Sequence, residues 1–172
     1  MAHPMKLSHV VMQTNQISEM RDWYCTVLCA KPAFENERMA FLAYDEEHHR
    51  IGLLSLDDYA VPERATVGLQ HISFTYESLW TLLENYERLK SEGILPVWSV
   101  NHGPTVSIYY SDPDRNRLEL QVDVFGTSDE ANAFMVGEIY QKDPVGVDFD
   151  PDEMFAQLRA GASFEALARR TR

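Results

Sequence analysis

The feature that most constrains the fold is an internal repeat, because one order of elements, β-α-β-β-β, occurs twice along the chain. In the first copy, hydrophobic patterning predicts a strand at 6–14, a helix at 15–28 and strands at 33–37, 39–44 and 50–56. After a loop at 57–65, it predicts a strand at 68–76, a helix at 78–91 and strands at 95–100, 105–111 and 117–122.

The two copies also match residue by residue. Leu7-Ser8-His9-Val10 aligns with Leu69-Gln70-His71-Ile72, and His49-Arg50-Ile51-Gly52-Leu53 aligns with Asn116-Arg117-Leu118-Glu119-Leu120. Any two half-buried strands look alike, but two matching pairs in the same order indicate duplication. We predict an α+β fold in which two βαβββ modules, 6–56 and 67–122, form a curved mixed sheet within a domain at 1–124.

The predicted helices carry recognisable end signals. Asn15 or Ser18 is available to cap the first helix, and Pro32 is expected to end it. Ser78 is the expected cap of the second helix, and Gly93 tolerates the left-handed geometry that stops it.

Residues 125–172 differ in composition and predict a helical C-terminal extension. The run Asp150-Pro151-Asp152-Glu153 is typical of a helix start, and Gly161 is expected to divide the following segment into two short helices. We interpret the extension as a packing or dimerisation element that offers no chemistry.

Charge and hydropathy exclude several classes of partner. With 15 basic and 27 acidic residues, the net charge of −12 argues against nucleic acid and against an anionic membrane. The longest apolar run, near 51–56, is far shorter than the ~20 residues that span a bilayer. No signal peptide is visible, and Cys25 and Cys29 fit free thiols on one helix face, so the expected location is cytoplasmic.

Two histidines, His9 and His71, hold equivalent positions in the first strands of the two modules. Either one alone would be interpreted as a core histidine with satisfied ring nitrogens. As a pseudo-symmetric pair, they are expected to converge between the modules, where a metal ion could bind.

A third ligand follows from the same symmetry. Glu119 lies inside an apolar strand, where a carboxylate is unfavourable unless it is paired or binds a cation; the alternative is an exposed glutamate on a half-wet sheet. Its counterpart, Gly52, has no side chain, so two imidazoles and one carboxylate would leave coordination positions open. That set is the facial triad of non-haem Fe(II) oxygenases, although Mn²⁺ or Zn²⁺ could use the same ligands.

Other candidate groups lie near these ligands in the sequence. His49 precedes Gly52, Tyr109 lies on the preceding strand of the last hairpin, and His102 lies in the loop before that strand. Their ordinary alternatives are a surface histidine, a core tyrosine and a turn histidine. Because strand side chains alternate, Tyr110 should face away from Tyr109, and His48 should likewise face away from whatever His49 faces.

These motifs make the sequence resemble the vicinal oxygen chelate superfamily, which comprises glyoxalases, bleomycin resistance proteins and extradiol dioxygenases. The most similar members are type I extradiol catechol dioxygenases. The resemblance is carried by Leu69-Gln70-His71-Ile72-Ser73-Phe74, by His48-His49-Arg50-Ile51-Gly52-Leu53 and by Tyr109-Tyr110-Ser111-Asp112-Pro113-Asp114-Arg115-Asn116-Arg117-Leu118-Glu119. The tail motif at 144–151 is similar to single-domain relatives.

The resemblance implies a role for each candidate residue. It assigns the iron ligands to His9, His71 and Glu119. It also assigns the acid–base histidine to His49, the active-site tyrosine to Tyr109 and the oxygen-stabilising histidine to His102. The implied activity is Fe(II)-dependent extradiol cleavage of a small aromatic diol by O₂, in aromatic hydrocarbon catabolism. An assembly with an even number of copies is implied only by analogy of fold.

The chain departs from well-studied members in having one pair of modules instead of two, which affects the expected substrate more than the metal. Three alternatives remain open at the level of sequence. One is another metalloenzyme of this fold, an isomerase, lyase or epimerase, which usually needs a fourth ligand at Gly52. Another is a non-catalytic protein of this fold that binds a small molecule. The third is a relative of this fold in which the ligands are vestigial.

Overall fold

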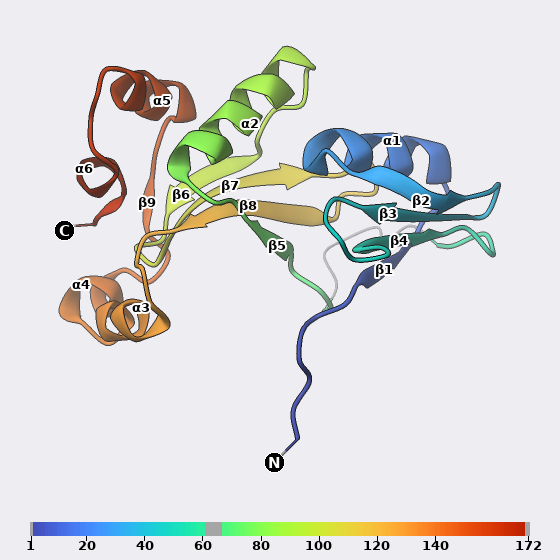
Figure 1. Cartoon of the computed structure of the whole chain (residues 1–172), viewed down its shortest axis with the longest axis horizontal. Helices are drawn as coiled ribbons and strands as arrows, with labels where there is room; N and C mark the ends of the chain where they lie inside the picture. Colours follow the sequence, from blue (N-terminus) through green and yellow to red (C-terminus); the bar gives the residue numbers. More distant parts are fainter. Residues whose placement is uncertain (1, 61–66, 171–172) are drawn as a thin grey trace. The chain divides into compact units, whose positions relative to one another are not determined.

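A computed structural model describes residues 2–60 and 67–170 (Figure 1). The chain divides into two compact units, Met1–Gly68 with Asp112–Asn116 and Leu69–Ser111 with Arg117–Arg172. Most of the predicted loop at 57–65 lies outside the described residues, since it overlaps 61–66. We describe each unit by itself.

The first unit is a four-stranded mixed sheet with one helix. Its elements are β1 (Val10–Gln13), α1 (Ile17–Leu28), β2 (Lys31–Glu35), β3 (Met39–Ala43) and β4 (Ile51–Leu54). The strand order is β1-β4-β3-β2, with β1 parallel to β4 and the other pairs antiparallel. Helix α1 lies against the sheet (Figure 1). Its apolar face supplies the fully buried side chains Met20, Tyr24 and Val27.

The turn at 112–116 packs within this first unit, against α1. The buried Tyr24 hydroxyl donates to Asp112 Oδ2 over 3.0 Å, and Gln16 Nε2 donates to Asp114 Oδ1 over 2.6 Å. Asp112 also accepts the Asn116 backbone N–H over 2.7 Å. Burial, with the nearby Asp112 charge, raises the pKa of Tyr24, so this phenol stays protonated and acts as a donor.

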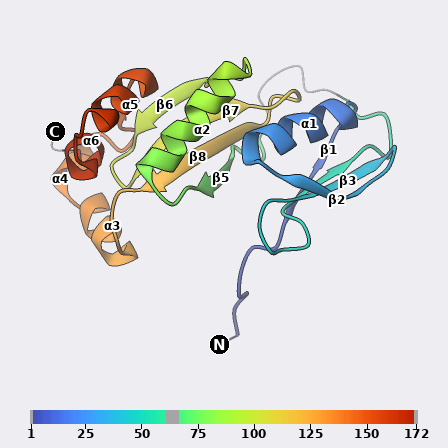
Figure 2. The ribbon, with the colours of Figure 1, turned by 45° about the horizontal axis from the view of Figure 1, so that its top comes forward.

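The second unit repeats the pattern of the first. Its first elements are β5 (Ile72–Thr75), α2 (Leu79–Ser91), β6 (Trp98–Asn101), β7 (Thr105–Ser111) and β8 (Arg117–Asp123). The sheet order is β5-β8-β7-β6-β9, again with the first pair parallel and the others antiparallel. Helix α2 covers one face of this sheet (Figure 2). The two βαβββ modules of the predicted α+β fold are therefore confirmed, with one hydrogen-bonded sheet in each.

The C-terminal extension is helical, as predicted, but it also contains a strand. It consists of α3 (Ser128–Met135), α4 (Glu138–Lys142), β9 (Val147–Asp148), α5 (Pro151–Arg159) and α6 (Phe164–Ala168). The two-residue strand β9 joins the edge of the sheet beside β6, which the sequence analysis did not anticipate. Helix α5 lies beside α2, where Arg159 forms two hydrogen bonds of 2.8 and 2.7 Å with the Glu87 carboxylate.

Helix ends confirm some sequence expectations and correct others. Ser78 caps α2, and its hydroxyl accepts the Thr81 backbone N–H over 3.1 Å. The N-cap of α1 is Gln16, not Asn15 or Ser18, and no side chain caps it. The helix ends at Leu28 because Cys29 turns into a left-handed conformation, whereas Pro32 lies within β2.

No helix among the residues described in the structure has both the length and the hydropathy needed to cross a membrane.

Candidate functional site

In the second unit, the sheet lines up a row of side chains across neighbouring strands. Trp98 pairs with Tyr109, Tyr109 pairs with Glu119, and Glu119 pairs with Ser73. Side chains directly opposite each other lie on the same face of a sheet. His71 stands two residues before Ser73 and therefore reaches the same face, next to Glu119.

Hydrogen bonds connect this row. His71 Nε2 lies 3.1 Å from Glu119 Oε2, and the Tyr109 hydroxyl donates to Glu119 Oε1 over 2.9 Å. His102 Nε2 lies 2.9 Å from the Tyr109 hydroxyl oxygen. We call these four residues, His71, Glu119, Tyr109 and His102, the polar row.

The carboxylate at the centre of the polar row is buried, with 5% of Glu119 exposed. Burial and the Glu119 charge raise the pKa of Tyr109, so its hydroxyl remains a hydrogen-bond donor at neutral pH. Tyr110 faces the opposite side of the sheet, as alternation predicts, and its buried hydroxyl has no hydrogen-bond partner among the described residues.

The first unit carries an apolar version of the same row. Phe34 pairs with Phe41, Phe41 pairs with Gly52, and Gly52 pairs with Val11. The registers therefore make Phe41 equivalent to Tyr109 and Gly52 equivalent to Glu119. His9, two residues before Val11, occupies the place that His71 has in the second unit.

Two histidines stack on this apolar row. The His49 ring lies 4.3 Å from the His9 ring and 4.7 Å from the Phe41 ring, with interplanar angles of 28° and 21°. Burial, with a contribution from His9, lowers the pKa of His49. A lowered pKa leaves the imidazole neutral near pH 7, the form that can accept a proton.

One sequence expectation near His49 is wrong. His48 does not face away from what His49 faces, because the Nδ1 atoms of the two residues lie 2.6 Å apart and the rings of both lie near His9. Strand β4 begins only at Ile51, so the alternation that governs strand side chains does not apply to these two residues.

The structure thus groups the predicted site residues in two sets. His9 and His49 stack in the first unit, and the polar row lies in the second. Among residues 2–60 and 67–170, no three His, Cys, Asp or Glu side chains are grouped so that they could hold a metal ion. The ligand set of His9, His71 and Glu119 therefore stays a prediction.

The sequence analysis missed several supports of the polar row. Trp98 stacks on Tyr109 at 5.0 Å and 25°, and its indole N–H donates to Asp148 over 2.8 Å. Gln70 contacts His71 Nδ1 through its amide oxygen, and the Val145 carbonyl accepts from His102 Nδ1. The Trp98 pairing follows from hairpin register, but no sequence signal marks a backbone carbonyl as a partner.

Comparison with known proteins gives a consistent result. The family model described as Glyoxalase/Bleomycin resistance protein/Dioxygenase superfamily matches residues 6–120. Biphenyl-2,3-diol 1,2-dioxygenase 2 from Rhodococcus globerulus is 45% identical over 94% of this chain and 86% of its own length. Biphenyl-2,3-diol 1,2-dioxygenase 3 from the same organism is 44% identical over 96% of this chain and 88% of its own length.

Solved structures share the fold at lower identity. Lactoylglutathione lyase from Agrobacterium tumefaciens superposes with a TM-score of 0.57 at 16% identity, covering 72% of this chain and 98% of that one. The fosfomycin resistance protein from Listeria monocytogenes superposes with a TM-score of 0.56 at 23% identity, covering 75% and 99%. These likenesses show the fold alone.

Proposed function

The chain belongs to the Glyoxalase/Bleomycin resistance protein/Dioxygenase superfamily and is an extradiol-type dioxygenase, and we propose that it opens the ring of a catechol-type diol at an iron(II) ion bound by His9, His71 and Glu119. Both atoms of dioxygen would enter a single ring-opened product, so the reaction needs no external reductant. A metal cofactor accompanies this activity. Its identity as iron(II) and its three ligands belong to the proposal.

The observation that carries the proposal is the contact between His71 and Glu119. Their Nε2 and Oε2 atoms lie 3.1 Å apart. A neutral imidazole and a carboxylate are both metal ligands, so these two neighbouring side chains would be available to hold one shared ion. Among the described residues, Glu119 has no lysine or arginine as an ion-pair partner, which leaves its buried charge available to a cation.

The equivalence of the two modules supports His9 as the third ligand. His9 holds the place of His71, while Gly52 holds the place of Glu119 and brings no side chain. Two imidazoles and one carboxylate leave open positions for the diol and dioxygen, which is the pattern of non-haem iron(II) oxygenases.

Bound iron(II) would supply the electron transfer that lets a diol and dioxygen react. His49 is the proposed general base, because its lowered pKa keeps it neutral and able to accept a proton from a diol hydroxyl. The resulting imidazolium can return a proton to oxygen as the O–O bond breaks. The stack on Phe41 fixes the plane of the His49 ring for both transfers.

Tyr109 and His102 orient and stabilise oxygen atoms at the same site. The Tyr109 hydroxyl is held between Glu119 and His102 over 2.9 Å on each side. A phenol fixed in this way presents its oxygen to a diol without having to be ordered during the reaction. His102 extends the row and stabilises charge that develops on oxygen.

The alternative functions make different demands on these positions. An isomerase, lyase or epimerase acting through an enediolate would need a fourth metal ligand or a general base at the position of Gly52. A protein that only sequesters an aromatic compound would not need the polar row. Metal bound without turnover of vicinal diols would favour the first alternative, and absence of metal binding would favour the second.

Turnover of a diol panel tests the proposal. The protein is loaded with iron(II) without oxygen, then mixed with catechol or biphenyl-2,3-diol under oxygen-18. We expect a yellow ring-opened product that carries two labelled atoms, with one dioxygen consumed per diol. Resorcinol and hydroquinone, whose hydroxyls are not adjacent, should not react. No reaction of any vicinal diol, or consumption of dioxygen without a ring-opened product, would exclude extradiol cleavage.

The proposal also includes the cellular location of the protein and its assembly. Cys25 and Cys29 are both free thiols, which agrees with the proposed cytoplasmic location. Nucleic acid and membrane are not proposed as partners, given the net charge of −12. An even-numbered assembly stays a prediction, which the native mass in solution would test.

A further inference from the structure

The imidazole of His102 is held from both sides. On one side Nε2 lies 2.9 Å from the Tyr109 hydroxyl oxygen. On the other side Nδ1 is hydrogen-bonded to the carbonyl oxygen of Val145, in the C-terminal extension. A carbonyl oxygen can only accept a hydrogen bond, so Nδ1 carries the hydrogen in this contact. The extension therefore fixes both the orientation of the ring and which nitrogen faces Val145.

A buried arginine ties the two partners of this hydrogen bond together. Arg170 Nη1 donates to the backbone carbonyl of His102 over 3.2 Å and to that of Asp143 over 2.9 Å. Its Nη2 donates to the Asp143 carboxylate over 3.0 Å. The other carboxylate oxygen of Asp143 accepts the Gly146 backbone N–H over 3.1 Å. One guanidinium thus links the His102 loop to the segment that carries Val145.

The burial of this guanidinium is unusual for so polar a group. Only 3% of the Arg170 side chain is exposed, and a buried charge is unfavourable unless it is paired and hydrogen-bonded. The half-exposed Asp143 carboxylate and two backbone carbonyl oxygens provide that compensation for the Nη atoms, whereas Nε has no partner among the described residues. Because two of these acceptors are backbone carbonyls, the arrangement depends on the local fold of the chain as well as on the ion pair.

Further contacts bind the extension to the same loop. Strand β9 pairs with β6, placing Val147 opposite Asn101. The Asn101 amide donates to the Ala168 carbonyl over 2.7 Å and accepts the Gly103 backbone N–H over 2.9 Å. Gly103 has a φ of +102°, and a Cβ there would lie 2.3 Å from the Phe134 ring, so the loop and α3 are in direct contact.

We propose that the C-terminal extension is part of the active site, with Arg170 as the positioning residue that holds His102 against Tyr109. Arg170 acts through His102 and Val145 and touches neither substrate nor metal. This inference rests on the proposed function, because it assigns His102 its place in the dioxygenase site. It replaces the interpretation that the extension offers no chemistry.

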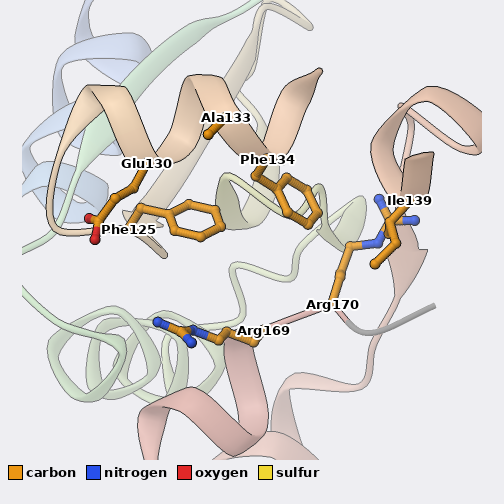
Figure 3. A pocket seen from close by; sticks show the side chains of 7 residues that line it. All are labelled: Phe125, Glu130, Ala133, Phe134, Ile139, Arg169 and Arg170. Carbon is orange, nitrogen blue, oxygen red and sulfur yellow. The ribbon is translucent and has the colours of Figure 1, made fainter. Parts of the chain in front are cut away.

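A cleft beside Arg170 makes the proposal testable by chemical rescue. The cleft, of about 450 Å³, is lined by Phe134, Ile139, Arg169 and Arg170 among others (Figure 3). In Figure 3 the guanidinium of Arg170 lies beside Ile139, whereas that of Arg169 points away. Truncation of Arg170 would leave a space that opens onto this cleft, so guanidinium ions from solution could enter it.

Two variants test the role of Arg170 in the full-length protein. For Arg170→Ala we expect kcat to fall roughly 10- to 100-fold, with KM and bound iron per chain unchanged. Guanidinium, added well below unfolding concentrations, should restore part of kcat. Arg170→Lys should lie between the wild type and Arg170→Ala, because an ammonium cannot reproduce the planar set of donors. Arg169→Ala, on the exposed side of the cleft, is the matched control and should behave like the wild type.

A spectroscopic readout separates this proposal from the proposed function. Nitrogen-15 spectra of histidine-labelled, metal-free protein report for each ring nitrogen of His102 whether it carries hydrogen, with His102→Gln used for assignment. We expect the Nδ1 signal of a protonated nitrogen in the wild type and a shifted signal in Arg170→Lys and Asp143→Asn. This result would support the positioning role even if no diol were cleaved.

Unchanged His102 signals in folded Arg170 variants would overturn the proposal, as would unchanged kcat. If Arg170→Ala does not fold, Arg170→Lys and Asp143→Asn test the proposal instead, because Lys keeps a long cationic side chain and Asn keeps the size of Asp. A loss of iron in parallel with activity would also contradict it, since Arg170 is not placed to bind metal.

Discussion

Glu119 and Gly52 hold equivalent positions in the two modules, because Glu119 pairs with Ser73 and Gly52 pairs with Val11 in parallel strands of the same register. The duplication therefore offers two places for a carboxylate and uses one. The absence of a carboxylate at Gly52 would distinguish an oxygen-activating site, which needs open coordination positions, from a site with four protein ligands.

Adding a carboxylate at position 52 should convert the proposed three-ligand site into a four-ligand site. Gly52→Glu adds a carboxylate at the position equivalent to Glu119, so we expect iron binding to persist and ring cleavage to be lost. Gly52→Ala is the control, since a Cβ there would lie 3.1 Å from a Val11 methyl group, which a small shift relieves. Iron content and diol turnover are measured on both variants. Full activity in Gly52→Glu would contradict the proposed open position.

Removing the charge of Glu119 should remove the metal while keeping the fold. Glu119→Gln retains an oxygen that can accept from the Tyr109 hydroxyl but loses the anionic ligand. We expect iron per chain to fall from near one to near zero after desalting, as it should in His71→Ala. Circular dichroism checks that the protein is folded. Stoichiometric iron in both variants would show that the ion binds elsewhere.

Replacing the proposed base should separate metal binding from turnover. In His49→Phe the new ring can still stack on Phe41 and His9, so the apolar row should stay in place. We expect wild-type iron content and a loss of kcat of roughly 10²–10⁴-fold, typical of losing a general acid–base group. Retention of kcat would remove His49 from the mechanism.

The two adjacent tyrosines should respond in opposite ways to loss of their hydroxyls. Tyr109→Phe removes hydrogen bonds to Glu119 and His102, so the free energy of unfolding should fall by about 1–2 kcal/mol. Tyr110→Phe removes a buried hydroxyl that has no partner in the described parts of the chain, so stability should stay constant or rise. Urea unfolding of both variants measures the difference. Equal losses would show that the polar row does not stabilise the sheet.

Much of the fold could be predicted because it repeats. Strand β7 has the bounds expected from its patterning, and the cap at Ser78 agrees with the expected one, since both depend on local sequence. Strand β2 begins earlier than predicted, at Lys31, because tertiary pairing with β3 overrides the local signal of Pro32. Strand β9 has two residues, too few to show any periodicity.

The site was predictable where side-chain chemistry and register decide it. Tyr109 and Glu119 could be placed together because a hairpin fixes which residues oppose each other. The support from Val145 and Arg170 could not be predicted, because one partner is a backbone carbonyl and the other contacts a loop 68 residues away in sequence. Such contacts depend on tertiary packing, which leaves no local pattern.

One iron ion is proposed to bind His9 together with His71 and Glu119. Anomalous diffraction at the iron edge, from crystals grown and loaded with iron(II) without oxygen, tests it most directly. We expect one iron peak per chain, bonded to both imidazoles and to the Glu119 carboxylate. A peak bonded to His71 and Glu119 but not to His9, or a peak at any other place in the chain, would contradict it.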